Sequence, residues 1–506
     1  MFLKRLLRAD GDTVSRTEKT LALTIANTVN TALNVLSGMI ASRLLTKIEV
    51  AVNSQTFLAY NTILPLLVLG TTSGIYYHLA QNEDRKRGAV KEAVLVTLAT
   101  SAAACVFLLL GGRQLLAERF HNVALSQTLL LLIPYALLTV PASVMSCVFV
   151  AENRLRFNAV YSTFQVSLQM IVAFAAMLLF RSGGALVAAK SLTGSLFAIV
   201  TIILAFSILP QGGDRADRPQ WSSTKALLAV SIPLGISAVV GALDLHLDQW
   251  IISTMMTPEE FAVYTRGAQE LPFVGAITGS ISTVIIVDLT KAAQKGEYTT
   301  AVDLFRKVSE KSSLFLLPAM VFFMAAARPL ITLLYTEAYL EAVPVFQIYL
   351  LYMPIRVAQY SPFLIALGCS KLILWKASAE LALNAVLSIF MVSHLGSIGA
   401  ALATIFLVYV FDVPLNFYFI SKKTGASWKR LLAFKKMFLC IVCSIPGAVA
   451  FWIFNALLPL PPVVALTLDL AIFCSITCPI FIRVFRLSPQ AFFQRIGEVW
   501  DHIHPN

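Results

Sequence analysis

Charged residues are scarce in this sequence. Asp, Glu, Lys and Arg make up 13% of its 506 residues, against about 25% in an ordinary soluble domain, whereas 58% of the residues are hydrophobic and the mean hydropathy is +0.78. This composition excludes a soluble protein. The sequence also lacks the Gly-x-x-x-x-Gly-Lys motif of a nucleotide-binding loop and any polar stretch long enough for a separate catalytic domain. We therefore expect no enzyme activity, no catalytic residues and no cofactor.

Cysteine is scarce as well, with seven residues in the chain. Cys440 and Cys443 fall on one face of a predicted helix, as do Cys474 and Cys478, but no histidine lies near either pair to complete a set of metal ligands. We interpret these thiols as packing residues and predict no metal site. The net charge of +12 lies in short loops rather than on a basic face of a soluble domain, which argues against a nucleic-acid partner.

Long apolar runs dominate the rest of the sequence. A membrane span needs about 20 mainly apolar residues, because the polar backbone groups must be satisfied within the helix. About fourteen runs meet this requirement, so the predicted fold class is an all-α integral membrane protein with about 14 transmembrane helices. The predicted spans cover residues 21–45, 52–79, 93–111, 125–150, 159–180, 184–209, 226–256, 261–289, 313–334, 342–367, 372–394, 396–420, 437–458 and 463–482.

The orientation follows from the distribution of Lys and Arg, which accumulate in cytoplasmic loops. Of the 39 such residues, 30 lie in or beside the two termini and the even-numbered loops, and six lie in or beside the odd-numbered loops. Both termini are therefore predicted to be cytoplasmic. The basic loops are also expected to contact anionic membrane lipids.

Two parts of the chain repeat each other at a nearly fixed offset. Residues 45–52, at the end of the first span, match residues 256–263, at the end of the seventh, with an offset of 211, and residues 184–188 match residues 399–403 with an offset of 215. Six spans per repeat place both copies the same way up, with a pseudo-two-fold axis along the membrane normal and a substrate site between them. The predicted domains are an N-terminal six-helix bundle over 1–209, a C-terminal six-helix bundle over 210–425, and two additional helices with a cytoplasmic tail over 426–506.

Charged side chains inside spans are candidate functional residues, because a charge at the centre of a span costs about 2.5 to 3.5 kcal/mol on insertion scales. Asp244 and Asp248 lie four residues apart on one face of the seventh span, and Arg266 and Glu270 are four apart in the eighth. A tight hairpin about Thr257 places Asp248 level with Arg266, and Asp244 level with Glu270. Two carboxylates at one depth resist ionising together. We hypothesise that these acidic residues couple transport to a proton or another ion, with a structural hydrogen-bonding role as the alternative.

Three cations inside spans are candidates for binding an anionic substrate. Arg356 lies near the centre of the tenth span, Arg266 lies in the eighth and Lys190 lies in the sixth. An arginine suits phosphate because its planar fork donates two parallel hydrogen bonds. For Lys190, six residues from a span end, the alternative is that the side chain snorkels to the interface. Asp412, in the twelfth span, is a further candidate for ion coupling or a counter-ion for a neighbouring helix.

Several stretches of the chain carry a family pattern. They are residues 42–46 (Ser-Arg-Leu-Leu-Thr), residues 248–252 (Asp-Gln-Trp-Ile-Ile) with residues 257–261 (Thr-Pro-Glu-Glu-Phe), and residues 396–403 (Gly-Ser-Ile-Gly-Ala-Ala-Leu-Ala). In these stretches the sequence resembles the polysaccharide transporter family, which includes O-antigen repeat-unit flippases and shares a superfamily with the multidrug and toxic-compound extrusion (MATE) proteins. The resemblance covers most of the chain. It implies a MATE-like fold of two pseudo-symmetric six-helix bundles plus two C-terminal helices.

The resemblance also implies a function. The expected activity is that of a flippase that moves a polyprenyl-pyrophosphate-linked oligosaccharide, such as a lipopolysaccharide or exopolysaccharide repeat unit, from the cytoplasmic to the outer leaflet of the bacterial inner membrane. Its expected partners are this lipid-linked oligosaccharide and the polysaccharide polymerase and glycosyltransferases of the same pathway. The alternatives are a cation-coupled multidrug exporter, a flippase for the peptidoglycan lipid precursor and, disfavoured by the short outer loops, a membrane glycosyltransferase or ligase.

Overall fold

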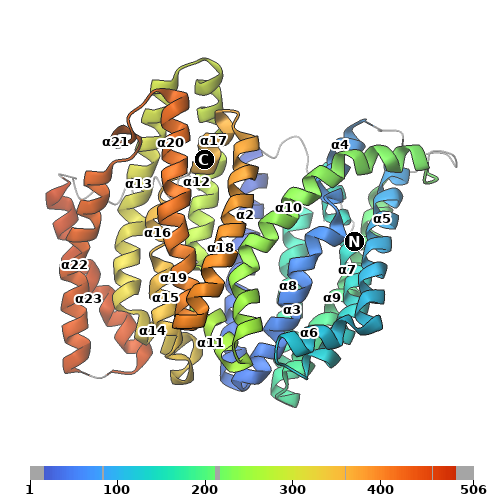
Figure 1. Cartoon of the computed structure of the whole chain (residues 1–506), viewed down its shortest axis with the longest axis horizontal. Helices are drawn as coiled ribbons and strands as arrows, with labels where there is room; N and C mark the ends of the chain where they lie inside the picture. Colours follow the sequence, from blue (N-terminus) through green and yellow to red (C-terminus); the bar gives the residue numbers. More distant parts are fainter. Residues whose placement is uncertain (1–15, 82–84, 211–216, 359, 459, 486–506) are drawn as a thin grey trace. The chain divides into compact units, whose positions relative to one another are not determined.

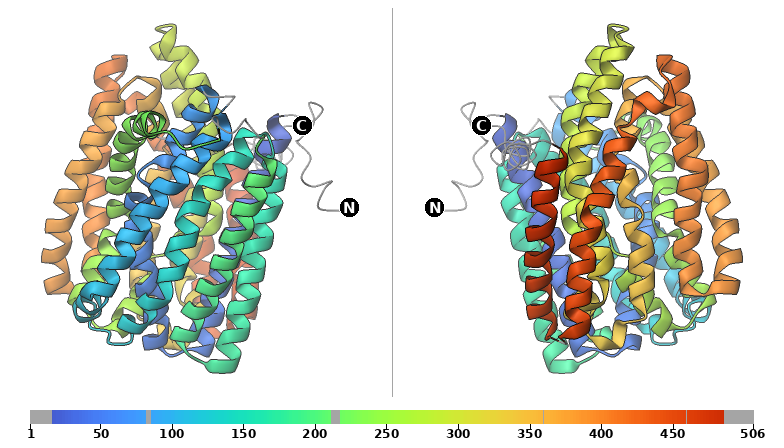
Figure 2. Two further views of the ribbon diagram at one scale, coloured as in Figure 1. Left: turned by 90° about the vertical axis from the view of Figure 1, so that its right-hand side faces the viewer. Right: turned by 90° about the vertical axis from the view of Figure 1, so that its left-hand side faces the viewer.

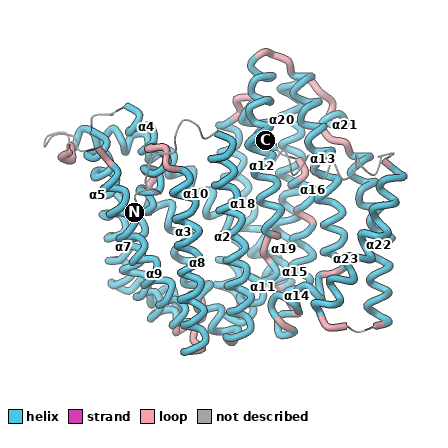
Figure 3. The backbone as a smooth tube through the Cα atoms, turned by 180° about the vertical axis from the view of Figure 1, so that it is seen from behind, coloured by secondary structure: helices cyan, strands magenta, loops and turns pink. Residues whose placement is uncertain are grey.

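The structure, a computed structural model, describes residues 16–81, 85–210, 217–358, 360–458 and 460–485. Within these ranges every regular element is a helix, and Figure 3 shows no strand among them. The chain divides into two compact units, Met1–Ala262 and Val263–Asn506. These are called unit 1 and unit 2 below.

Unit 1 is a bundle of nine helices in its described part, and it also holds the start of a tenth (Figure 1). The helices are α2 (Arg16–Leu44), α3 (Lys47–Val68), α4 (Thr71–Gln81), α5 (Lys86–Phe107), α6 (Arg113–Arg119), α7 (Leu125–Ala151), α8 (Leu155–Phe180), α9 (Gly183–Ile208) and α10 (Trp221–Met255). A π-helical turn at Leu108–Gly112 joins α5 to α6. The long helix α10 packs against α3 and α4 and so belongs to this unit.

Unit 2 contains the remaining helices. They are α11 (Pro258–Gly267), which starts in unit 1, α12 (Pro272–Gln294), α13 (Tyr298–Ala325), α14 (Ala327–Tyr335), α15 (Ala342–Leu350), α16 (Met353–Arg356), α17 (Tyr360–Ala366), α18 (Ser370–Leu395), α19 (Ser397–Leu407), α20 (Val413–Thr424), α21 (Trp428–Leu431), α22 (Phe434–Leu457) and α23 (Pro462–Val484). A π-helical turn at Val408–Asp412 joins α19 to α20. The predicted division of the chain at residue 210 rests on the sequence repeat and stays a prediction.

The predicted fold class is confirmed. Ten helices of the described part are long and apolar enough to cross a membrane, and each matches one predicted span. The other four predicted spans correspond to α2 and to three interrupted segments, formed by α3 with α4, by α11 with α12, and by α15 to α17. The interruptions were not predicted, because each predicted span was taken as one continuous helix.

The repeated Thr and Glu residues cap helices. The backbone N–H of Thr257 donates to Glu260 Oε2 over 2.9 Å, and the Glu260 N–H donates back to Thr257 Oγ1 over 3.3 Å. This is a capping box, which satisfies two donors at the start of α11. In the first repeat Thr46 Oγ1 likewise accepts from the N–H of Glu49 at the start of α3. The family pattern at these positions therefore has a local structural cause.

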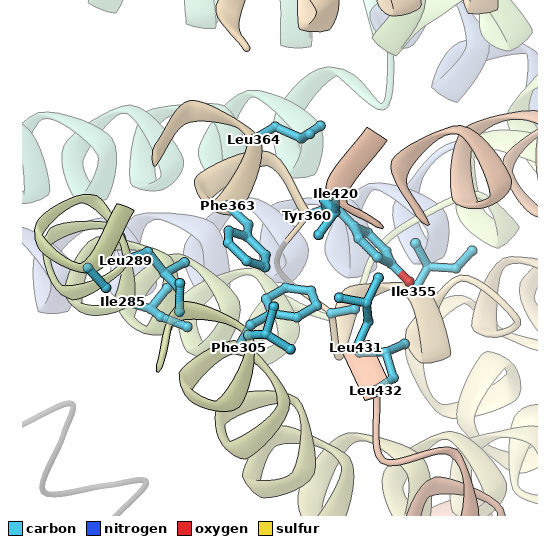
Figure 4. Packing of buried hydrophobic residues seen from close by; sticks show 14 of the residues in the cluster. Ile285, Leu289, Phe305, Ile355, Tyr360, Phe363, Leu364, Ile420, Leu431 and Leu432 are labelled. Atoms are coloured by element: carbon cyan, nitrogen blue, oxygen red, sulfur yellow. The ribbon is translucent and has the colours of Figure 1, made fainter. Parts of the chain in front are cut away.

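A buried apolar cluster fixes the middle of unit 2 (Figure 4). The ring of Phe305 in α13 lies 5.0 Å from the ring of Phe363 in α17 and 5.9 Å from that of Tyr360, measured between centroids. Ile355 of α16 and Leu289 of α12 belong to the same cluster. The short helices α16 and α17 are thus held by packing on α12 and α13 rather than by their own length.

The two helices outside the repeat pack on α13 through aromatic side chains. Phe322 of α13 lies with its ring centroid 5.5 Å from that of Phe451 in α22 and 5.3 Å from that of Phe473 in α23. All three side chains are buried. The right-hand view of Figure 2 shows α22 and α23 side by side along this edge of unit 2.

Candidate functional site

The eighth predicted span is interrupted between α11 and α12. Helix α11 has 10 residues, which is about 15 Å at 1.5 Å per residue and about half of a hydrocarbon core of about 30 Å. It ends at Gly267, where an added Cβ would lie 2.7 Å from the carbonyl oxygen of Ala342. Pro272 then starts α12, because proline suits the first turn of a helix and disrupts a helix interior. Residues 268–271 are therefore non-helical at about the depth of the bilayer midplane.

Side chains of this non-helical segment bind neighbouring helices. Tyr335 at the end of α14 donates a hydrogen bond to Gln269 Oε1 over 2.7 Å. Glu270 Oε2 accepts from Arg356 Nη2 over 3.1 Å and forms an ion pair with it. A broken helix inside a membrane is tolerated where protein groups satisfy it or where it lines a water-filled cavity. Two of the candidate site residues are thus brought together.

Arg356 lies at a second interruption. It is the last residue of α16, and α17 starts at Tyr360. Its guanidinium carbon lies 5.0 Å from the centre of the Tyr352 ring, which favours a cation over the ring face. The side chains of Arg356 and Glu270 are 41% and 44% exposed. A paired arginine that remains this accessible can exchange its carboxylate for another anion, such as a phosphate oxygen.

Arg266 has different surroundings from Arg356. It is 7% exposed, and its guanidinium carbon lies 5.4 Å from the centre of the Tyr335 ring. The prediction that Arg266 and Glu270 share a face of one continuous helix is wrong, since α11 ends at Gly267. The predicted pairs of Asp248 with Arg266 and of Asp244 with Glu270 join residues of different units and stay predictions.

The two aspartates of α10 lie in unit 1. Asp248 is 8% exposed, and its Oδ1 accepts a hydrogen bond from the backbone N–H of Gln249 over 2.8 Å. Asp244, one turn earlier, is half-buried. Their predicted role in ion coupling stays a prediction.

The second predicted span, which is the counterpart of the eighth span in the first repeat, is also interrupted, between α3 and α4. Helix α10 packs on both of these helices. Leu69 and Gly70 both have positive φ there, at 49° and 68°. A Cβ on Gly70 would lie 2.3 Å from the carbonyl oxygen of Ser231 in α10, so only glycine fits this crossing. The second span of each repeat is therefore broken. Interruptions in corresponding segments of two halves are a pointer to a transporter's binding site.

Lys190 joins two helices of unit 1. Its Nζ donates to Asn53 Oδ1 over 3.2 Å and lies 5.2 Å from the centre of the Phe57 ring, and both partners belong to α3. The carbonyl oxygen of Lys190 accepts from Gln169 Nε2 over 3.1 Å. A contact of Lys190 with an anionic substrate stays a prediction.

Asp412 is paired with a lysine that the sequence interpretation overlooked. Lys376 of α18 forms an ion pair with Asp412 Oδ1 and donates to Asn416 Oδ1 over 3.0 Å, while Asn416 Nδ2 donates to Asp412 Oδ2 over 2.9 Å. Both carboxylate oxygens therefore accept from protein donors. The π-helical turn that ends at Asp412 places it at this contact. Opposite charges in consecutive spans were the signal in the sequence.

The sequence of the chain places it in a known family. A family model described as "Polysaccharide biosynthesis protein" matches residues 41–344, which is more than half of the chain. This chain belongs to the polysaccharide biosynthesis protein family. The family expected from the sequence patterns is thereby confirmed. No curated protein matches the chain.

Several solved structures of other proteins have a fold similar to that of this chain. One is "Lipid II flippase MurJ, inward closed conformation", with a TM-score of 0.70 and 13% identity over 91% of this chain and 99% of that chain. A second is the inward-facing form of a multidrug resistance MATE family transporter, with a TM-score of 0.59 and 15% identity over 82% and 100%. A third is a transporter of the same superfamily from Pyrococcus furiosus, with a TM-score of 0.56 and 16% identity over 83% and 98%. The predicted MATE-like fold is confirmed.

Proposed function

We propose that this member of the polysaccharide biosynthesis protein family is a flippase for a polyprenyl-pyrophosphate-linked oligosaccharide, which it moves from the cytoplasmic to the outer leaflet of the bacterial inner membrane by alternating access. The observation that carries the proposal is the accessible pair of Glu270 and Arg356 at two helix interruptions. The family supports a role in polysaccharide synthesis. The fold, shared with a lipid II flippase and with MATE transporters, supports transport rather than catalysis.

The pair suits a site that must bind and release an anion inside a membrane. In the empty carrier Glu270 compensates the charge of Arg356, which lowers the cost of keeping the arginine in the span. An arriving pyrophosphate replaces the carboxylate as the partner of the guanidinium, so the arginine is compensated in both states. The displaced carboxylate of Glu270 then needs a proton or a cation. This makes Glu270 the residue through which an ion is coupled to transport.

Placement and partners follow from the same proposal. The excess of Lys and Arg in the termini and even-numbered loops supports a cytoplasmic location for both termini. The glycosyltransferases that build the lipid-linked oligosaccharide act before the flippase. The polymerase that joins repeat units consumes its product at the outer leaflet.

A deletion strain tests the proposal. Loss of the gene is expected to cause lipid-linked oligosaccharide to accumulate facing the cytoplasm, and the wild-type gene is expected to clear it. Arg356→Gln is expected to clear at least tenfold less, because an arginine bond to a charged group contributes about 1.5 to 3 kcal/mol. Arg328→Gln is the matched control, since Arg328 is an exposed arginine of the same unit.

Four results would count against the proposal, each in a different way. No accumulation in the deletion strain would contradict lipid-linked oligosaccharide as the substrate. Accumulation of the peptidoglycan lipid precursor instead would assign the chain to that lipid, and loss of drug resistance with unchanged lipid pools would assign it to cation-coupled export. Normal clearance by Arg356→Gln would remove the pair from the site.

A further inference from the structure

Unit 1 contains a polar cavity between α7, α8 and α9. Its volume is about 150 Å³, and twelve residues line it. Eight of these side chains carry a hydroxyl or an amide group, and none of the twelve is charged. The helices α7, α8 and α9 pack directly on one another, so the cavity lies inside a single compact unit.

Several polar groups of this cavity have no protein partner. Within the described part of the chain, the side chains of Ser146, Asn158 and Gln165 form no hydrogen bond with another residue. Ser146 is exposed, and the other two are half-buried. All three lie in helices that cross the membrane. Gln165 lies ten residues inside α8, where an unsatisfied polar group costs several kcal/mol in hydrocarbon, so this side chain needs water or a polar ligand.

The lining selects the class of ligand. A pyrophosphate needs cations, a cationic drug favours carboxylates, and an isoprenoid chain needs an apolar groove, but this lining is neutral and rich in hydroxyls. Sugars present many hydroxyl donors and acceptors together with apolar ring faces. The half-buried ring of Tyr161 supplies aromatic surface beside the polar groups, and the fully buried ring of Phe149 packs 6.4 Å from it, measured between centroids.

The volume also fits this class. One water needs about 10 to 15 Å³ of cavity volume, so a cavity of about 150 Å³ has room for several waters or for a small polar group such as a sugar ring. It is smaller than the roughly 300 to 1,000 Å³ of pockets for drug-sized ligands. We propose that this cavity binds one sugar residue of the lipid-linked oligosaccharide. The inference rests on the proposed function, and it assigns the sugar to unit 1.

The location agrees with loading from the cytoplasm. Asn158 lies in the first turn of α8, close to the start of the helix, where Arg154 is the N-cap and Arg156 is the second helical residue, beside the loop between α7 and α8. The predicted orientation places this loop on the cytoplasmic side. The cavity therefore lies towards the cytoplasmic end of unit 1, the side from which the oligosaccharide is expected to enter.

Direct binding to the purified full chain in lipid nanodiscs tests the inference. The two probes are the lipid-linked oligosaccharide purified from the deletion strain and undecaprenyl pyrophosphate without sugar. Ser146→Val and Gln165→Leu are each expected to weaken binding of the first probe about three- to tenfold, as for the loss of one net hydrogen bond, and to leave binding of the second unchanged. Ser207→Val is the matched control, because Ser207 is an exposed serine of α9 that bonds to its own helix.

The outcomes separate this inference from the proposed function. Arg356→Gln is expected to weaken binding of both probes. If the wild-type chain binds neither probe, the proposed function fails. If the wild-type chain binds both but the two cavity variants bind the sugar-bearing probe like wild type, or lose affinity for both probes equally, the sugar site is refuted while the proposed function stands. Ser146→Phe, which fills the cavity from an exposed position, must also weaken binding of the sugar-bearing probe selectively.

Discussion

The ion pair of Lys376 and Asp412 predicts a large loss of stability when one partner is removed. Lys376 is 8% exposed, and the side chains of the two partners are 11% and 14% exposed. Lys376→Met leaves the Asp412 carboxylate inside a span with Asn416 as its remaining donor among the contacts described above. Asp412→Asn leaves the lysine ammonium beside two amide oxygens. Each variant therefore keeps one uncompensated charge in a position with little solvent.

The magnitude follows from the burial. Removing one partner of a buried ion pair costs about 3 to 5 kcal/mol, mainly because the other charge remains. For a unit of about 150 to 250 residues, 1 kcal/mol shifts the midpoint of thermal unfolding by about 2 to 4 °C, so each single variant is expected to unfold about 6 to 20 °C below wild type. The double variant loses both charges and keeps an amide pair. We expect it to unfold well above either single variant.

Thermal unfolding of the purified chain in detergent, followed by loss of the monodisperse protein, measures these shifts. Lys422→Met is the matched control, because Lys422 is an exposed lysine in the last turn of α20. The reasoning is refuted if both single variants unfold within 2 °C of wild type, or if the double variant falls by the sum of the two single losses. Such additivity would mean that the two groups do not interact.

The same double variant tests the role of Asp412 in transport. Both carboxylate oxygens accept from protein donors, which favours a structural role over binding a mobile ion. We therefore expect the double variant to clear lipid-linked oligosaccharide at a rate close to wild type. A folded double variant that transports without the ion dependence of wild type would instead assign Asp412 to ion coupling.

Three further predictions concern the fold. Gly70→Ala is expected to lower the unfolding midpoint more than Gly296→Ala, because both residues have positive φ, at 68° and 74°, but nothing lies within 4 Å of a Cβ at Gly296; equal midpoints would contradict the tight crossing. Thr257→Ala removes the capping box and is expected to cost about 0.5 to 2 kcal/mol, measured by the same unfolding assay against Thr257→Ser, which keeps the cap. Phe451→Ala opens a gap in the buried aromatic cluster on α13, α22 and α23 and is expected to lower the free energy of unfolding by about 3 to 5 kcal/mol. The variant should also make α22 and α23 more susceptible to proteolysis. Unchanged cleavage would show that these helices do not depend on the cluster.

The helical fold class and the approximate number of spans could be predicted from composition, because a bilayer imposes one length and one polarity on every span. The interruptions were not predicted, because each apolar run was taken as one continuous helix. Their local signals were present. Pro272 follows Gly267 by five residues, and Gly70 interrupts an otherwise helical run.

The candidate residues could be found from their charge, but their partners could not. Arg356 lies 86 residues from Glu270 in the sequence. Their contact depends on tertiary packing, which brings the end of α16 close to the segment between α11 and α12. Counting residues from a turn relates only neighbouring helices. The pairing of Asp412 with Lys376 joins two consecutive spans, and it was overlooked because Lys376 lies near the end of its predicted span.

The interruption after Gly267 decides which charged residue of the eighth span is accessible. In a continuous helix, residues four apart lie on one face, and Glu270 would share the face of Arg266, which packs on Tyr335 and is 7% exposed. Because the helix ends three residues earlier, Glu270 leaves that face, meets Arg356 and is 44% exposed. One sequence pattern therefore produces a buried structural cation and an accessible anion. The break in the helix, rather than the type of residue, makes Glu270 and Arg356 the candidate site.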